Sequence, residues 1–201
     1  MSFLIRSAAA ALLLFALTSL AQAQGVSLRG TIESVSDETL VVHTREDETA
    51  KVHLKPSIPI GALIKAQLSD IKPGLFIGAA AVPGADGALK ALEVHIFPEA
   101  MRGAGEGFRP FDLAPRSSMT NGTISAAVDT VDGPKLTVTY KGGEQTIIVD
   151  KATPIVMLTT GRIEDLKSGA GVIVFASAKG ADGAYEAARL IVGRDGVKPP
   201  M

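Results

Sequence analysis

The feature that most constrains this chain is an internal duplication of turn and core residues. Three short motifs in the first half recur, in the same order, in the second half. The first copy carries Gly30-Thr31-Ile32, Asp70-Ile71-Lys72-Pro73-Gly74 and Gly84-Ala85-Asp86-Gly87-Ala88. The second copy carries Gly122-Thr123-Ile124, Asp165-Leu166-Lys167-Ser168-Gly169 and Gly180-Ala181-Asp182-Gly183-Ala184. The offsets are 92, 95 and 96 residues, so the few inserted residues fall in turns and the module is the unit to explain.

Residues 1–23 have the pattern of a secretory signal peptide. Arg6 precedes an apolar run over residues 8–20, and Ala21-Gln22-Ala23 has the small-x-small pattern of a cleavage site. The run is shorter and richer in alanine than the roughly 20 apolar residues of a membrane span. We therefore expect cleavage after Ala23, a periplasmic or secreted protein, and no membrane span afterwards. An uncleaved N-terminal anchor is the alternative.

The composition excludes several classes of function. The chain has no cysteine, which excludes disulfides, thiolate metal sites and a cysteine nucleophile. Without Arg6, 19 basic residues face 21 acidic ones, a net charge of −2 that does not attract nucleic acid. There are two Tyr, seven Phe and no Trp, so stacking platforms for bases or sugars are also scarce.

Both copies have the pattern of short β-strands separated by turns. In the first copy, strand-like runs occupy residues 28–35, 40–44, 51–54, 58–64, 75–82 and 89–97. In each copy a single helical turn, near residues 68–74 and 163–169, interrupts the strands. The sequence therefore predicts an all-β protein with two tandem small OB-like β-barrels, each with one short helical turn.

The expected domain boundaries follow from the repeat. The first barrel module spans residues 24–97, a Gly/Pro-rich linker spans 98–120, the second module spans 121–193, and a flexible tail spans 194–201. The linker contains the apolar segment Phe108-Arg109-Pro110-Phe111. This segment either lies as a strap across one of the chain's own barrels or binds a partner.

The pattern also resembles a known family. The Gly-Thr-Ile opening, a Leu-x-Val strand, the Asp-Leu-Lys-x-Gly turn and the closing Asp-Gly hairpin are similar to exported bacterial tandem β-barrel modules of unknown function. Chains with His95-Ile96-Phe97-Pro98-Glu99-Ala100-Met101-Arg102-Gly103 and Gly193-Arg194-Asp195-Gly196-Val197 often carry the automatic label of a metal ABC transporter permease. A permease needs several membrane spans, which this sequence does not contain. The resemblance covers nearly the whole mature chain and implies an oligomer-binding barrel fold without a known activity.

The three histidines are the candidate metal ligands. A hairpin over residues 40–54 would place His43 opposite His53 on the outer face, with Cβ atoms about 4.5–5.5 Å apart. Two imidazoles at that separation could bind Zn²⁺, Cu²⁺ or Ni²⁺, with His95 or a carboxylate completing the site. The alternative is a pair of solvated histidines, because Arg45 and Lys51 would lie beside them and repel a cation.

No residue set has the spacing of a catalytic site. Asp70 with Lys72, and Asp165 with Lys167, could be acid and base pairs, but their repetition at a turn favours capping. The Gly-rich stretch 103–107 lacks the Lys-Ser/Thr of a phosphate loop. We therefore expect a non-enzymatic binding or scaffold protein that holds an envelope protein or polymer. A periplasmic divalent-metal-binding protein that uses its surface histidines is the alternative.

Overall fold

The structure is a computed structural model of the 201-residue chain, and it describes residues 25–84, 87–131 and 133–199. The expected signal peptide and its cleavage site lie outside the described residues. Within the described ranges, no helix has the length and apolar character needed to cross a membrane.

The described residues form a β-structure with a few short 3₁₀ turns, which confirms the all-β prediction. The first copy contributes β1 (Val26–Val35), β2 (Thr39–Thr44), β3 (Thr49–His53), β4 (Ile60–Lys65), β5 (Phe76–Pro83) and β6 (Leu89–Ile96). β7 (Gly107–Pro110) lies between the copies. The second copy contributes β8 (Ser118–Thr130), β9 (Gly133–Tyr140), β10 (Gly143–Ile148), β11 (Ile155–Thr160), β12 (Gly171–Lys179) and β13 (Tyr185–Gly193). The predicted helical turns are η1 (Leu68–Asp70) and η4 (Ile163–Asp165), and η3 (Glu99–Met101) is a further one.

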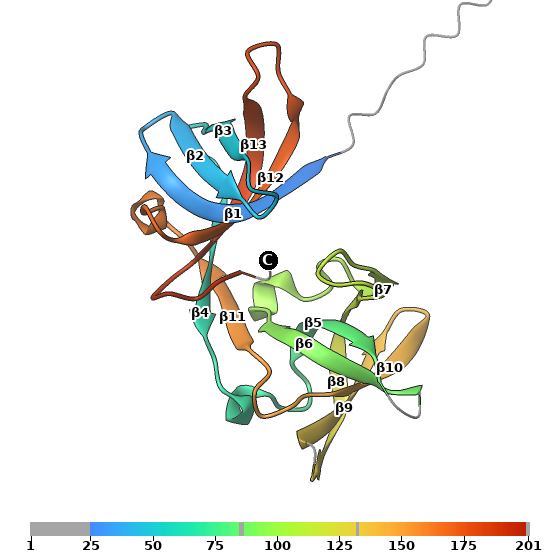
Figure 1. The fold of residues 1–201 in the computed structure, drawn as a ribbon. Helices are drawn as coiled ribbons and strands as arrows, with labels where there is room; N and C mark the ends of the chain where they lie inside the picture. The colour runs from blue at the N-terminus through green and yellow to red at the C-terminus, as the bar shows by residue number, and fades with distance from the viewer. Residues whose placement is uncertain (1–24, 85–86, 132, 200–201) are drawn as a thin grey trace, which may run out of the picture.

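The strands form two lobes that share one sheet (Figure 1). In the first lobe, β1 pairs with β12 and β2, β3 pairs with β2 and β13, and β12 pairs with β13. In the second lobe, β8 pairs with β5 and β9, β10 pairs with β9 and β6, and β5 pairs with β6. Each lobe therefore has five strands in a closed circuit of pairings.

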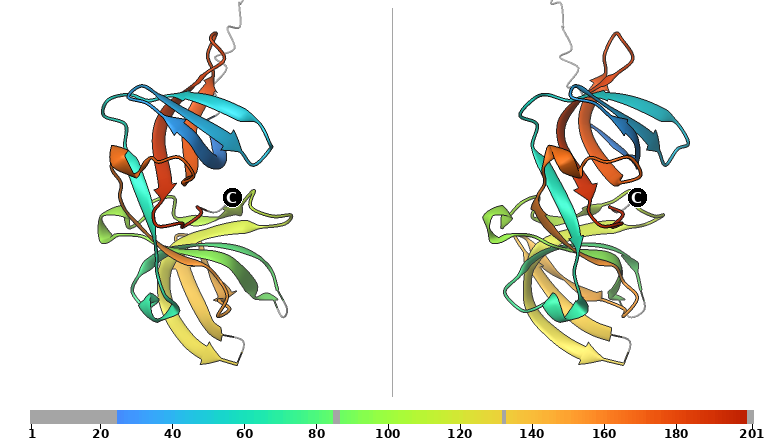
Figure 2. Two further views of the ribbon diagram at one scale, coloured as in Figure 1. Left: turned by 60° about the vertical axis from the view of Figure 1, so that its left-hand side comes forward. Right: turned by 90° about the vertical axis from the view of Figure 1, so that its left-hand side faces the viewer.

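Each lobe combines strands from both copies, whereas we expected residues 24–97 and 121–193 to pair within themselves. The first lobe takes β1, β2 and β3 from the first copy and β12 and β13 from the second. Conversely, the second lobe takes β5 and β6 from the first copy and β8, β9 and β10 from the second. The exchange occurs because β4 and β11 leave their own lobes and run between them as an antiparallel pair, as all three views show (Figures 1 and 2).

The register of this crossover is symmetric. Leu63 of β4 lies opposite Leu158 of β11, and the two residues occupy equivalent positions in the two copies. On their other edges, β4 pairs in parallel with β13 and β11 pairs in parallel with β6. A local pseudo-two-fold axis therefore passes between Leu63 and Leu158.

The hydrophobic core has one cluster in each lobe and a small one at the crossover. In the first lobe Ile32 and Val42 pack in one cluster with Val174 and Leu190 of the other copy. The second lobe has the reciprocal cluster, and Leu63, Val156 and Leu158 form the third between the lobes. Each core therefore takes apolar side chains from both copies, so the copies bury their apolar faces against each other.

The Gly-Thr-Ile motif repeats because a side chain does not fit at its glycine. A Cβ on Gly30 would lie 2.0 Å from the His43 carbonyl oxygen, and one on Gly122 would lie 2.4 Å from the Thr139 carbonyl oxygen. These distances are far inside van der Waals contact, so both positions need glycine for the close approach of the next strand.

The Asp-x-Lys-x-Gly motif forms a turn and joins the two copies. Asp70 Oδ2 accepts a hydrogen bond from the backbone N–H of Gln67, and Asp165 Oδ2 accepts one from Arg162, both at 2.8 Å. The predicted capping role is therefore confirmed. The motif glycines have φ of 90° at Gly74 and 85° at Gly169, and their N–H groups donate at 2.8 Å to Ile124 and Ile32 of the opposite copy.

Candidate functional site

The hairpin register that would bring two histidines together is wrong. His43 lies opposite Thr49, and His53 lies opposite Thr39. The turn is shorter than expected because Asp47 adopts a left-handed conformation, with φ of 64°, and Thr44 N–H donates to the Glu48 carbonyl at 2.7 Å. The observed register differs from the expected one by an even number of residues, so both histidine side chains stay on the outer face. Because His43 lies opposite Thr49, four residues before His53, the two histidines are separated by about 13 Å along the strand.

The two histidines of this hairpin, His43 and His53, each lie beside a different carboxylate. His43 is half-exposed, with Nε2 3.1 Å from Asp47 Oδ1 and Nδ1 3.5 Å from Glu33 Oε1. His53 Nε2 lies 2.8 Å from Asp182 Oδ2, and the hydrogen bond from His53 lowers the pKa of Asp182.

The third histidine lies in the second lobe and is largely buried. His95 Nε2 is 2.5 Å from Glu93 Oε1, and neither atom makes a hydrogen bond among the described residues. Across the described ranges, no three His, Asp or Glu side chains are grouped closely enough to hold a metal ion. The structure therefore does not bring together the histidines of the metal hypothesis.

The linker is partly ordered as a β-strand on the chain's own sheet. We call residues 98–117 the strap, because β8 begins at Ser118. In the strap, β7 pairs antiparallel with β8, so that Phe108 lies opposite Thr120 in the second lobe. Phe108 remains 46% exposed. The apolar segment of the linker therefore lies across the protein itself, the first of the two expected arrangements.

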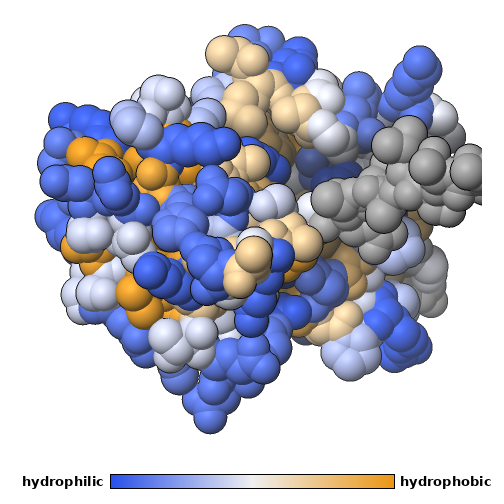
Figure 3. Space-filling model, turned by 90° about the horizontal axis from the view of Figure 1, so that it is seen from above, coloured by the Kyte–Doolittle hydropathy of each residue, from blue (hydrophilic) through white to orange (hydrophobic). Residues whose placement is uncertain are grey.

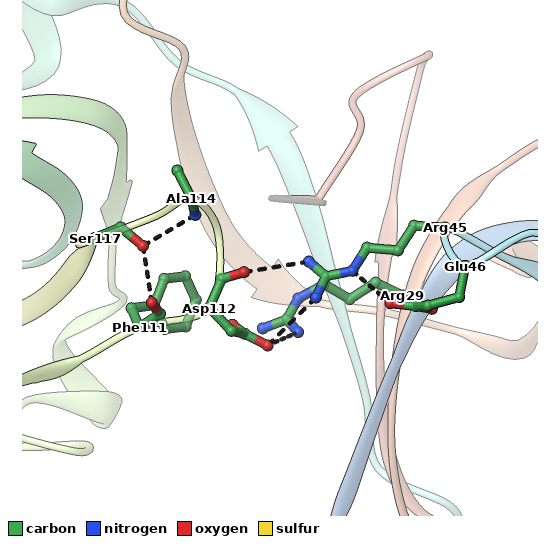
Figure 4. A network of polar contacts seen from close by, with 7 residues as sticks. All are labelled: Arg29, Arg45, Glu46, Phe111, Asp112, Ala114 and Ser117. Carbon is green, nitrogen blue, oxygen red and sulfur yellow. Dashed lines mark hydrogen bonds and ion pairs between the residues drawn. The ribbon is translucent and has the colours of Figure 1, made fainter.

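The strap also reaches the first lobe through an arginine clamp (Figure 4). Asp112 Oδ2 accepts a hydrogen bond from Arg29 Nη1 at 2.6 Å, and Arg45 Nη2 lies 3.7 Å from the same oxygen. The Arg29 guanidinium also lies 5.4 Å from the centroid of the Phe111 ring. Because Arg29 is buried and Asp112 is half-exposed, this contact neutralises a buried cation and links the lobes.

A cleft lies beside the crossover, where the strap meets the exchanged strands. It has a volume of about 410 Å³, within the range of about 300–1,000 Å³ typical of small-molecule sites. Its apolar wall comes from β4, η3, β11 and β13, and is formed by Ile60, Met101, Leu158 and Ile191. β4 belongs to the first copy, β11 and β13 belong to the second, and η3 lies in the strap, so the cleft is built from both copies.

One cation stands at this cleft. Arg189 is the only charged residue among the described residues that line it. Its guanidinium carbon lies 3.7 Å from the centroid of the Phe175 ring. Arg189 is an exposed residue whose pKa is lowered by desolvation, and within the described part of the chain it makes no hydrogen bond or ion pair.

The pseudo-two-fold axis places a second cleft on the other side of the crossover. This cleft has a volume of about 780 Å³ and is lined by Ile155, which is equivalent to Ile60 in the first cleft. Besides apolar residues it contains Lys65, Lys151, Lys198 and Asp195, so it carries more charged groups than the first cleft. The duplication therefore produced two related clefts with different chemistry.

The surface at the far end of the first lobe offers no comparable concentration of apolar side chains. Seen from above, it is mostly hydrophilic, with hydrophobic residues scattered between polar ones (Figure 3). The apolar cleft at the crossover is accordingly the stronger candidate for a binding site.

Sequence reasoning missed Arg189 because it lies in no motif. Strand pairing makes it equivalent to Glu93, since Leu190 pairs with Ile60 as Val94 pairs with Ile155. The reversal of charge between the copies at this position was the available signal. Comparison with protein-family models, curated proteins and solved structures finds no match to this chain.

Proposed function

We propose that this chain is an exported, non-enzymatic binding protein that takes its ligand in the apolar cleft at the crossover. The observation that carries the proposal is the cleft itself, which combines an apolar wall from both copies with one charged side chain. The closed circuits of five strands support small OB-like barrels as the rigid frame, each built from both copies. Periplasmic or secreted localisation rests on the signal-like pattern of residues 1–23.

A neutral apolar dye tests the cleft without assuming the charge of the ligand. We expect N-phenyl-1-naphthylamine to bind the protein in a saturable way, measured by its fluorescence. Ala100→Trp should abolish this binding, because Ala100 is exposed and lines the cleft, so that a larger side chain fills it without disturbing a core.

The matched control is Ala152→Trp, since Ala152 is an exposed alanine at the second cleft. This variant should bind the dye as the unmodified protein does. No saturable binding, or equal binding by Ala100→Trp, contradicts the proposed function. Export is tested separately by N-terminal sequencing of protein from the cell envelope, where a start at Gln24 is expected and a start at Met1 contradicts it.

A further inference from the structure

Resting on the proposed function, we propose that the ligand of the crossover cleft is a single-chain amphiphile with a carboxylate head group, which Arg189 binds while the apolar wall takes the alkyl chain. The single positive charge at the cleft, the absence of a protein anion on that charge among the described residues, and the apolar wall each support this assignment.

The guanidinium of Arg189 is held in place but lacks an anion. Its guanidinium carbon lies 3.7 Å over the Phe175 ring, and its N–H groups have no acceptor among the described residues. A guanidinium presents paired N–H donors whose spacing matches the two oxygens of a carboxylate. Because Arg189 is exposed where it lines the cleft, a ligand carboxylate can reach the guanidinium from solvent.

The rest of the cleft suits an alkyl chain. Ile60, Leu158 and Ile191 offer branched aliphatic surface, and Met101 adds a flexible side chain that adapts to ligand shape. Among the described lining residues no carboxylate competes for Arg189, and no second cation calls for a dianion. One positive charge beside an apolar wall complements a monoanionic head group with an apolar body.

The second cleft shows what a different ligand preference would require. It holds three lysines for which no ion pair is found within the described part of the chain, together with Asp195. Such a surface favours hydrophilic anions over amphiphiles. The pairing of a lone arginine with an apolar wall therefore belongs to the first cleft alone.

The experiment measures displacement of N-phenyl-1-naphthylamine by dodecanoate, decanoate and dodecanol, each below its aggregation concentration. Dodecanoate should displace the dye, and decanoate should do so about 15-fold more weakly, from roughly fourfold per methylene. Dodecanol, which lacks the carboxylate, should bind at least tenfold more weakly than dodecanoate. Arg189→Gln should weaken dodecanoate about 10- to 100-fold, the range expected for hydrogen bonds to a charged group, while dye binding stays unchanged.

The control variant is Arg162→Gln. Arg162 is an exposed arginine outside the cleft, and the first copy has Gln67 at the equivalent position, so glutamine is compatible with this turn. Unchanged dodecanoate affinity is expected. Equal affinity for dodecanol and dodecanoate, or no effect of Arg189→Gln, overturns the carboxylate assignment while leaving the cleft intact. Failure of the dye to bind overturns the proposed function instead.

Discussion

The Asp165–Arg194 ion pair ties the C-terminal segment to the crossover, and its removal gives a prediction with an internal control. Arg194 Nε and Nη2 donate to the two Asp165 oxygens at 2.9 and 2.6 Å, and Nη2 also donates to the Thr160 carbonyl. The hydrogen bonds from Arg194 are the main cause that lowers the pKa of Asp165 from 3.8 to about 2. Asp165→Asn should therefore destabilise the fold at neutral pH.

The expected magnitude follows from the pKa. A difference of about 1.8 units corresponds to about 2.4 kcal/mol of stability as an upper limit. The Asp165 side chain is 14% exposed and that of Arg194 is 27% exposed, so solvent screening reduces the effect. We expect Asp165→Asn to lower the free energy of unfolding by about 1–2 kcal/mol at pH 7.

The pH dependence has a definite sign. Because the folded-state pKa lies below the unfolded value, this contribution is fully present above about pH 4 and is lost as the pH falls towards 2. The difference between the unmodified protein and Asp165→Asn should therefore shrink as the pH is lowered from 5 to 2. Urea unfolding followed by circular dichroism at pH 7, 5, 3 and 2 measures it.

Asp70→Asn is the matched control. Asp70 makes the same turn hydrogen bond to a backbone N–H, but no arginine is paired with it in the described structure. Asparagine retains an acceptor oxygen there, so we expect a cost of at most about 0.5 kcal/mol. Equal costs for the two variants at pH 7, or a difference that persists undiminished at pH 2, would refute the role assigned to Arg194.

Three further predictions concern the exchanged architecture. Leu63→Ala and Leu158→Ala should each cost about 2–5 kcal/mol in urea unfolding, because both side chains are buried at the crossover; a cost below 1 kcal/mol at either would contradict its packing role. Gly30→Ala and Gly122→Ala should each lower the free energy of unfolding by about 1–3 kcal/mol, because the added Cβ would clash with a carbonyl of the paired strand. Unchanged melting temperatures would contradict this close approach of the strands. If a protease site replaces residues 113–116, the cleaved halves should co-elute in native gel filtration, because each lobe contains strands of both copies; separation without denaturant would contradict the exchange.

The sequence by itself determined the local structure of this protein. The duplicated motifs predicted the strands, the two helical turns and the capping role of Asp70 and Asp165. Alternation along residues 40–54 correctly placed His43 and His53 on the outer face. These features depend on side-chain periodicity and turn chemistry, which act over a few neighbouring residues.

The tertiary structure decided which strands pair, that the histidines stay apart and where the cleft lies. A duplicated sequence gives β1 two nearly equivalent partners, β5 and β12, and the apolar alternation is the same for either. The choice depends on β4 and β11 remaining extended and pairing through Leu63 and Leu158, a contact between residues 95 positions apart. The hairpin register likewise depended on one left-handed residue, Asp47. Arg189 acquires its place beside an apolar wall only through this exchange, because local sequence specifies the faces of strands but not which copy supplies their neighbours.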